Sequence, residues 1–340
     1  DTTLIFWTGL FVCKETYISG KRGKIFMREK QKAAAPCRSL WKDIKKNRTR
    51  LLMLLVPVTM AVIFCYIPMP GVIIAFKKYN YMDGIFGSEW NGLDNFRYLL
   101  ISKKLWSLTR NTLLYNIAFI SIGLVFEVGI AIILNEMLHL RFKKIAQSLM
   151  FLPHFISWVV VATIMLNIFG DHGVLNNILR TMGFEGFNIY AYENAKYWPV
   201  VMVALKTWKS VGYGSVVYLA AIVGISPEIN EAAKIDGANI WQRIWRITIP
   251  CLKPTIVIMT LLAVGGIFRG DFGMFYQLVK GQHLLEASDV LDTYIYRTMM
   301  STSNMGWSAA AGLYQSVLCF ITINVVNFTV KKIEPDYALY

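Results

Sequence analysis

The stretch that decides the fold of this chain reads ISPEINEAAKIDGANIWQRIWRITIP, from residue 225 to residue 250. It is a polar loop between two long apolar segments, and its residues predict two short helices. Ser226 is a favoured N-cap residue, and Pro227 suits the first helical position, where a missing N–H leaves no bond unmade. Gly237 is placed to end the first helix in a left-handed conformation. Pro250 then opens the next apolar run.

One face of the first predicted helix is narrow and carries small side chains. Ile229, Ala232, Ala233 and Asp236 share that face, at the spacing i, i+3, i+4 and i+7. A face of this kind suits docking into a cleft on another protein. The alternative is a short amphipathic helix that lies on a membrane surface.

The composition is that of an integral membrane protein. Hydrophobic residues make up 55% of the 340 residues, charged residues 16%, and the mean hydropathy is +0.45. Soluble domains are about 45–50% apolar and about 25% charged. The net charge of +14 is concentrated between Lys21 and Arg50, beside the first apolar segment. Such a flank marks the cytoplasmic side and attracts anionic lipid, so we expect membrane lipid and no nucleic acid as a partner.

Six apolar segments predict six transmembrane helices, at about residues 51–76, 111–134, 145–169, 197–223, 254–268 and 307–330. With both termini cytoplasmic, the basic segments 141–144 and 331–332 fall inside. The loops 170–196 and 271–305, which carry more acid than base, fall outside. The same orientation puts the loop 225–250 in the cytoplasm. We therefore predict an all-α, multi-pass protein of the cell membrane.

The domain organisation follows from these segments. Residues 1–50 form a basic cytoplasmic tail, residues 51–334 a six-span domain that contains the loop 225–250, and residues 335–340 a cytoplasmic C-terminal tail. Met27 is the first methionine, and we interpret residues 1–26 as an upstream translation or an artefact. The five cysteines and four histidines have no paired or ligand spacing, so we expect no disulfide framework and no metal site.

The motif E-A-A-x-x-D-G-A, followed by I-T-I-P, resembles the EAA motif of ABC importer permeases, with Ile249 where leucine is usual. The resemblance implies the type I importer permease fold, in which this loop is a coupling helix that sits in a groove of a cytoplasmic ATPase. The residues to which it assigns the coupling are Glu231, Ala232, Ala233, Asp236, Gly237 and Pro250.

Further stretches are similar to a narrower group. Residues 267–277, 292–296, 306–312 and 335–340 resemble the lipoprotein-associated permeases for polysaccharides and complex oligosaccharides of Gram-positive bacteria. The resemblance implies an ATP-driven sugar importer with a second, homologous permease as heterodimer partner, two copies of an ABC ATPase, and an extracellular substrate-binding lipoprotein. The chain contains no G-x-x-x-x-G-K-[ST] loop, so ATP hydrolysis belongs to the partner. We expect no catalytic residue and no cofactor.

Polar and aromatic residues within or beside the spans are candidates for a carbohydrate path. Ionisable groups in a membrane are costly and tend to face an interior or a water-filled path. The candidates are Trp208, Lys209, Tyr213, Arg269, Asp271, Phe275, Tyr276, Gln277 and Gln315. The structural alternative is that Arg269 pairs with Asp271, that Lys206 extends to the membrane surface and that the aromatic rings form interfacial belts. We expect Glu127 to make an interhelical hydrogen bond.

Other functions remain open at this point. Within the permease class, amino-acid or peptide import is the alternative, and the cations Lys206, Lys209 and Arg269 favour an acidic sugar. A membrane-embedded enzyme would need a cluster of catalytic carboxylates or a histidine-based site, whereas the acids here are dispersed. A secondary transporter commonly shows an internal repeat, and none is evident. A sensor or assembly subunit would not need an intact EAA loop.

Overall fold

The structure is a computed structural model that describes residues 45–101, 104–170, 173–183, 195–279, 282–302 and 304–333. The predicted tail segments 1–26 and 335–340 lie outside the described residues. The described chain is almost entirely helical, apart from a short antiparallel ribbon. In that ribbon β1 (Lys77–Lys78) pairs with β2 (Glu89–Trp90), with Lys77 opposite Trp90.

The helices in chain order are α2 (Arg48–Ala61), η1 (Val62–Tyr66), η2 (Met69–Phe76), α3 (Gly84–Gly87), α4 (Asp94–Ile101), α5 (Lys104–Glu136), α6 (Leu140–Phe155), α7 (Trp158–Phe169), α8 (Val174–Thr181), α9 (Trp198–Val223), α10 (Pro227–Ile235), α11 (Ile240–Arg243), η3 (Ile244–Thr248), α12 (Ile249–Gly265), α13 (Phe272–Leu278), α14 (Gln282–Ser288), α15 (Leu291–Thr302) and α16 (Met305–Ile333).

Five helical stretches of the described chain are long and apolar enough to cross a membrane: Arg48–Phe76, Lys104–Glu136, Trp158–Thr181, Ile240–Gly265 and Met305–Lys332. A sixth is α9 taken with α10, although the two helices are bent by 71°. We assign α9 to the span and α10 to the loop, because the bend falls at residues 224–226, where the apolar run of α9 ends. The prediction of an all-helical membrane protein is confirmed.

The third predicted span, 145–169, is wrong as a single helix. The chain breaks at Ile156 and Ser157, between α6 and α7. Pro153 lies in the last turn of α6, and the hydroxyl of Ser157 caps α7 by accepting a bond from the N–H of Val160 at 3.3 Å. A proline near the end of one helix disfavours its continuation, and a serine N-cap favours the start of the next helix, so together they place the break here.

The fifth predicted span, 254–268, begins too late. The continuous helical stretch starts at Ile240, directly after a capping box in which Asn239 and Gln242 exchange side-chain and backbone bonds of 2.8 and 2.9 Å. A five-residue π turn, η3, precedes Pro250, which lies in the first turn of α12. The proline therefore continues an existing helix, and the loop 225–250 contains the first turns of the span.

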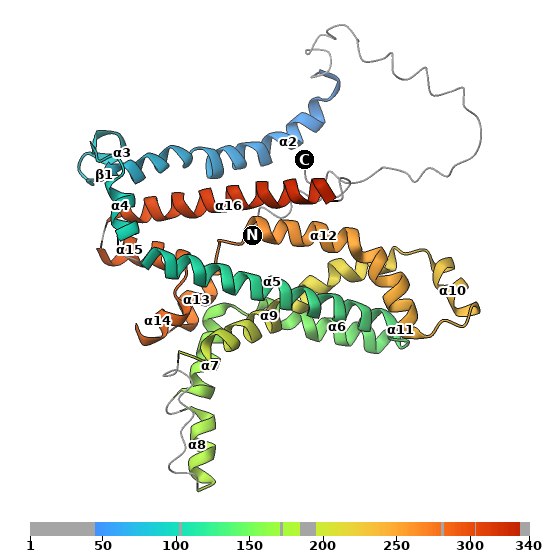
Figure 1. Cartoon of the computed structure of the whole chain (residues 1–340). Helices are drawn as coiled ribbons and strands as arrows, with labels where there is room; N and C mark the ends of the chain where they lie inside the picture. The colour runs from blue at the N-terminus through green and yellow to red at the C-terminus, as the bar shows by residue number, and fades with distance from the viewer. Residues whose placement is uncertain are drawn as a thin grey trace. The chain divides into compact units, whose positions relative to one another are not determined.

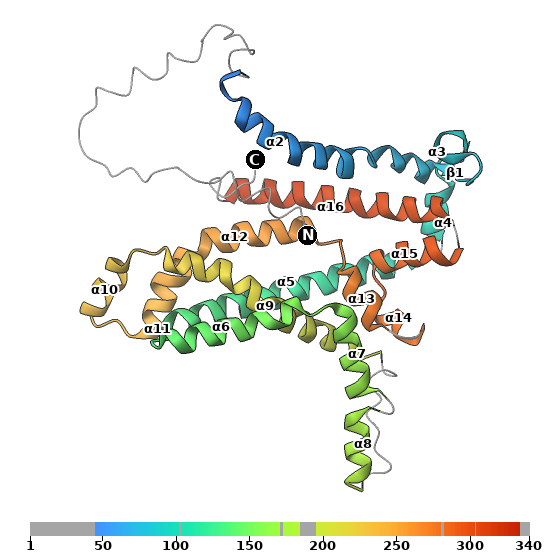
Figure 2. The same cartoon turned by 180° about the vertical axis from the view of Figure 1, so that it is seen from behind.

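The described helices fall into two compact units, of which Asp1–Pro68 contains α2 and η1, and Met69–Tyr340 contains the others. Within the second unit α9 packs along α5 and also contacts α6 and α12, while α16 lies along α12 (Figure 1, Figure 2). One end of this bundle carries α10 and α11, and we call it the α10 end. The other carries α13, α14 and α15, and we call it the α13–α15 end.

Two glycines of α9 allow its neighbours to come close. A Cβ atom at Gly212 would lie 1.9 Å from the carbonyl oxygen of Met150 in α6, and one at Gly214 would lie 2.2 Å from the carboxylate of Glu127 in α5. Apolar burial against lipid gives little net force between helices, so association depends on close packing at small residues. The bundle therefore depends on these two positions.

Apolar clusters fill the bundle at both ends. At the α13–α15 end, Trp198 and Met202 of α9 are buried with Phe275 and Leu278 of α13. At the α10 end, Leu134, Tyr218 and Leu252 join α5, α9 and α12. Because α9 and α5 each contribute to both clusters, these two helices form the centre of the second unit.

Replacing Gly212 by alanine should lower the melting temperature of the purified protein in detergent, because the new methyl group would overlap the backbone of α6. Gly129→Ala is the matched control, since nothing lies within 4 Å of a Cβ atom there. In a helix alanine is favoured over glycine by about 1 kcal/mol, so the control should be neutral or stabilising. Equal melting temperatures for the two variants would contradict the packing described here.

Candidate functional site

The helix α10 begins and ends at the residues that the sequence predicts. Pro227 occupies the first turn with Glu228 beside it, although Ser226 makes no side-chain capping bond. At the other end Gly237 has a φ of +77°, its N–H donates to the carbonyl of Lys234 at 3.1 Å, and the next N–H, of Ala238, donates to Ala233 at 2.9 Å. This pair of bonds is a Schellman motif, which needs a left-handed residue at this position.

The surface of α10 is unusually open. None of its nine residues is buried, and the large apolar side chains of Ile229 and Ile235 are 48% and 86% exposed. Glu231, Ala232, Asp236 and Gly237 are exposed as well. Isolated helices shorter than about 12–15 residues are marginal in water. Contacts with the rest of the described chain therefore contribute little to holding α10 in place.

An ion pair connects α11 to the end of α5. Arg243 of α11 donates to the carboxylate of Glu136, the last residue of α5, at 3.3 Å, and both side chains are largely buried. Sequence reasoning missed this pair. The sequence feature that could have identified the pair is an acidic residue at the end of one apolar segment and a basic residue before another, both on the predicted cytoplasmic side.

Asp271 is the centre of a polar corner at the α13–α15 end. Its Oδ2 accepts bonds from the ammonium of Lys206 at 2.8 Å and from the indole N–H of Trp158 at 3.1 Å. Its Oδ1 caps α13 by accepting from the N–H of Met274 at 3.2 Å. The ion pair of Asp271 is thus with Lys206 of α9, and the alternative that pairs it with Arg269 was wrong.

Lys209 closes the break in the third span. Its ammonium donates to the carbonyl oxygens of Pro153 at 3.1 Å and His154 at 2.7 Å, and also to that of Ile156. It lies 5.4 Å from the ring centre of Trp158. The last carbonyls of a helix have no partner within it. Lys209 therefore caps α6 from a different helix.

The turn between α12 and α13 is held from α15 and α16. Oδ2 of Asp292 accepts from the backbone N–H of Gly270 at 2.5 Å and from the amide of Gln315 at 2.9 Å. The same amide of Gln315 donates to the carbonyl of Phe268 at 2.7 Å. Burial raises the pKa of Asp292, and the bonds from Gly270 and Gln315 oppose that rise. Sequence reasoning did not assign Asp292 a role.

The other candidate path residues differ in accessibility. Trp208 is 46% exposed and Tyr213 52%, with the ring of Tyr213 stacked on His154 at 4.4 Å. Phe275 is 1% exposed and packs edge-on against Tyr115 at 4.9 Å. On α13, Tyr276 is 44% exposed and Gln277 is half-buried.

The candidates therefore fall in three places rather than in one pocket. Trp208 and Tyr213 lie on α9 and face α6. Arg269, Asp271 and Gln315 lie at the turn before α13. Tyr276 and Gln277 lie on α13 itself. Glu127 faces Gly214 between α5 and α9. Among the described residues, no group of three or more His, Cys, Asp or Glu side chains could hold a metal ion.

Residues 127–334 match the family of binding-protein-dependent transport system inner membrane components. This match covers more than half of the chain, including the loop 225–250, and the chain belongs to that family. It is a multi-pass membrane protein and a transport subunit.

Characterised relatives and solved structures are similar over most of the length. The polygalacturonan/rhamnogalacturonan transport system permease protein YteP of Bacillus subtilis (strain 168) is 32% identical over 92% of this chain and 95% of its own length. Protein LplB of the same organism is 32% identical over 87% and 93%. A chain of a bacterial ABC transporter involved in the import of the acidic polysaccharide alginate is 32% identical, with a TM-score of 0.77 over 87% of this chain and 99% of that one.

Exchanging the charges of Glu136 and Arg243 tests the connection between α5 and α11. Glu136→Arg and Arg243→Glu should each lower the melting temperature, because each leaves like charges close together. The double variant should recover most of the loss, since a partly buried pair is worth about 1 kcal/mol. Additive losses in the double variant, measured by thermal unfolding in detergent, would show that the pair is not coupled.

Proposed function

We propose that the chain is the permease subunit of an ATP-driven importer for oligo- or polysaccharide fragments, coupled to a separate ATPase through α10. The observation that carries the coupling is the exposed, nine-residue α10, bent by 71° from α9 and ended by Gly237. Carbohydrate as cargo is supported by the relatives, which are named for polygalacturonan, rhamnogalacturonan and alginate transport. The catalytic step of ATP hydrolysis lies in the partner.

The geometry offers a route from α10 to the far end of the bundle. On one side α10 joins α9, and on the other it leads through Gly237 into the stretch Ile240–Gly265. That stretch has 26 residues and is about 39 Å long at 1.5 Å per residue. A movement of α10 therefore reaches the polar corner at Asp271 along two stiff helices. The ion pair between Glu136 and Arg243 adds α5 to the moving part.

The polar corner is where we place the control of access. Lys206 lies on α9, and Asp271 follows α12 in the turn before α13, so the pair joins α9 to the end of the second helical stretch that α10 connects. Their side chains are 30% and 25% exposed, so water or a hydroxyl-rich solute can compete for the pair. A relative movement of α9 and α12 would lengthen the 2.8 Å contact and open this end.

The partners follow from the same reasoning. The apolar Ile229 and Ile235 on α10 are suited to a groove of a cytoplasmic ABC ATPase, of which two copies would serve two permeases. We propose a second, homologous permease as the heterodimer partner and an extracellular lipoprotein as the source of substrate. One structural relative is an alginate transporter in complex with an alginate-bound periplasmic protein, which supports a binding protein in this system.

Gly237→Asp should uncouple the transporter while leaving the chain in the membrane. Aspartate tolerates the left-handed region better than most non-glycine residues, but its strain of up to about 1–2 kcal/mol adds to a carboxylate placed at the negative end of the helix dipole, at a helix end that has no buried residue. The measurement is substrate-stimulated ATP hydrolysis by the complete transporter in proteoliposomes, together with co-purification of the ATPase. We expect stimulation to fall at least tenfold.

The control is Gly183→Asp. Gly183 also has a left-handed backbone, with a φ of +88°, but it follows α8, away from α10. The same local strain should leave stimulated hydrolysis unchanged there. Full stimulation in Gly237→Asp, or an equal loss in both variants, would contradict the assignment of α10 as the coupling helix.

A further inference from the structure

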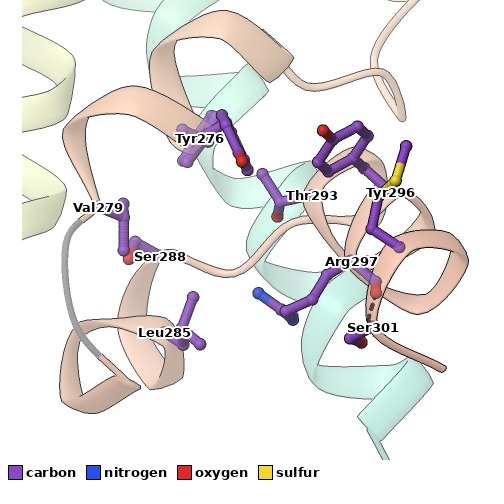
Figure 3. A pocket seen from close by; sticks show the side chains of 10 residues that line it. Tyr276, Val279, Leu285, Ser288, Thr293, Tyr296, Arg297 and Ser301 are labelled. Atoms are coloured by element: carbon purple, nitrogen blue, oxygen red, sulfur yellow. Dashed lines mark hydrogen bonds between the residues drawn. The ribbon is translucent and has the colours of Figure 1, made fainter.

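A cavity of about 460 Å³ lies between α13, α14 and α15, at the end of the bundle opposite α10 (Figure 3). Small-molecule sites commonly measure about 300–1,000 Å³. If α10 is cytoplasmic, as the proposed function requires, this cavity opens toward the outside. None of the residues assigned to coupling takes part in it, and of the predicted path only Phe275 and Tyr276 line it.

One wall of the cavity is aromatic and firmly held. The rings of Tyr276 and Tyr296 meet edge to face, with centroids 5.1 Å apart and planes at 76°. Phe272 stacks on Tyr276 at 5.1 Å and also contacts Tyr296 at 4.9 Å. A hydrogen bond with Tyr276 raises the pKa of the Tyr296 hydroxyl. The wall thus offers ring surfaces with hydroxyl groups at their edges.

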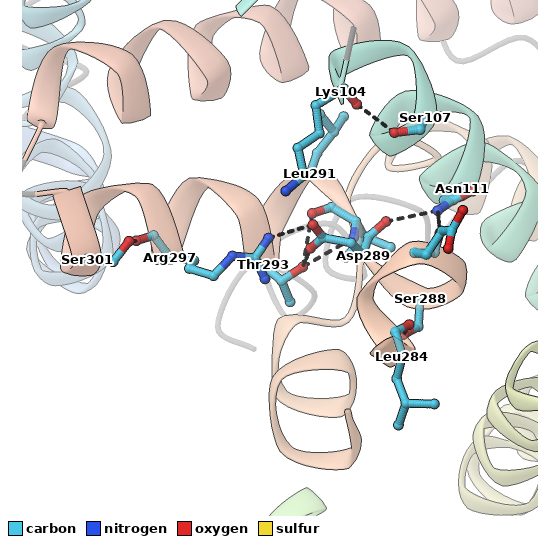
Figure 4. Close-up of polar contacts among 12 residues, drawn as sticks. Lys104, Ser107, Asn111, Leu284, Ser288, Asp289, Leu291, Thr293, Arg297 and Ser301 are labelled. Atoms are coloured by element: carbon cyan, nitrogen blue, oxygen red, sulfur yellow. Dashed lines mark hydrogen bonds and ion pairs between the residues drawn. The ribbon is translucent and has the colours of Figure 1, made fainter. Parts of the chain in front are cut away.

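The facing wall presents the guanidinium group of Arg297, whose positive charge is balanced by a buried carboxylate. Arg297 donates to Oδ2 of Asp289 at 2.5 Å (Figure 4). The carboxylate side chain is 4% exposed, whereas the Arg297 side chain is 33% exposed and points into the cavity in Figure 3. Thr293 donates to Oδ1 of Asp289 at 2.9 Å, and Asn111 of α5 donates to the backbone carbonyl of the same residue at 3.3 Å. The pair is therefore fixed in place.

The charge balance distinguishes between two kinds of ligand. Of the described residues that line the cavity, Arg297 alone is charged, and Asp289 compensates it. A carboxylate ligand would have to share the guanidinium with a buried carboxylate 2.5 Å away, and like charges so placed repel. A neutral hydroxyl accepts from the exposed N–H groups without that penalty.

We propose that this cavity is a binding subsite for one neutral pyranose unit of a carbohydrate. The C–H face of the sugar ring would lie on the ring of Tyr296, with Tyr276 at its edge, and its hydroxyls would accept from Arg297. The inference rests on the proposed function. It adds that the carbohydrate contains a sugar unit without a carboxylate, and that this unit binds next to the polar corner at Asp271, where α13 begins. An oligosaccharide held here by a neutral unit would have its neighbouring units directed at Lys206 and Asp271.

The test uses the complete transporter in lipid nanodiscs without its binding protein. The probes are the methyl glycosides of glucose, galactose, mannose and rhamnose, and the methyl glycosides of the corresponding uronic acids, detected by saturation-transfer NMR. At least one neutral glycoside should bind more tightly than any uronate. Its dissociation constant should rise at least tenfold in Tyr296→Ala and in Arg297→Gln, and should change little in Tyr296→Phe, which keeps the ring.

Tyr81→Ala serves as the control, because Tyr81 is an exposed tyrosine outside the cavity. ATP-driven uptake of oligosaccharides by the parent, with the binding protein restored, is measured in parallel. Uptake without neutral-glycoside binding, tighter binding of a uronate, or equal binding in the parent and Tyr296→Ala would overturn the subsite alone. Failure of the parent to import any oligosaccharide would instead contradict the proposed function.

Discussion

The structure depends on the close approach of α9 to its neighbours. At Gly212 and Gly214 the absence of a side chain lets α6 and α5 come within van der Waals distance of the α9 backbone. In a lipid environment such contacts supply much of what holds helices together, because lipid solvates apolar side chains as well as another helix does. The polar contacts at the α13–α15 end then follow. Lys206 and Lys209 reach Asp271 and the carbonyls of α6 only because α9 lies this close.

Polar groups have different roles at the two ends of the bundle. At the α10 end the polar residues are mostly exposed, and the pair Glu136 and Arg243 is an internal contact. At the α13–α15 end they bond to one another and to backbone groups at points where helices stop. Asp271, Asp292 and Gln315 all act at the turn between α12 and α13. The first end therefore leaves most of its polar groups exposed, whereas the second uses them to hold the turn between two helices.

Much of the fold could be predicted from the sequence, because the decisive signals are local. The apolar segments, the start at Pro227 and the left-handed Gly237 each depend on a few adjacent residues. The errors came from residues whose effect depends on distant contacts. Pro153 ends α6 where Lys209 can satisfy the freed carbonyls, and Pro250 is accommodated after a π turn. The partner of Asp271 lies 65 positions earlier in the chain, at Lys206, and no spacing rule identifies such a pair.

The capping of α6 by Lys209 has a consequence for the order of membrane insertion. The carbonyls of His154 and Ile156 precede their lysine by 55 and 53 positions, so they leave the ribosome first. Until α9 has entered the bilayer these carbonyls lack a donor, and unsatisfied backbone groups are not tolerated in the hydrocarbon region. The nascent chain must therefore keep this segment in contact with water or with the insertion machinery. Its final change of direction is completed only after a later helix has arrived.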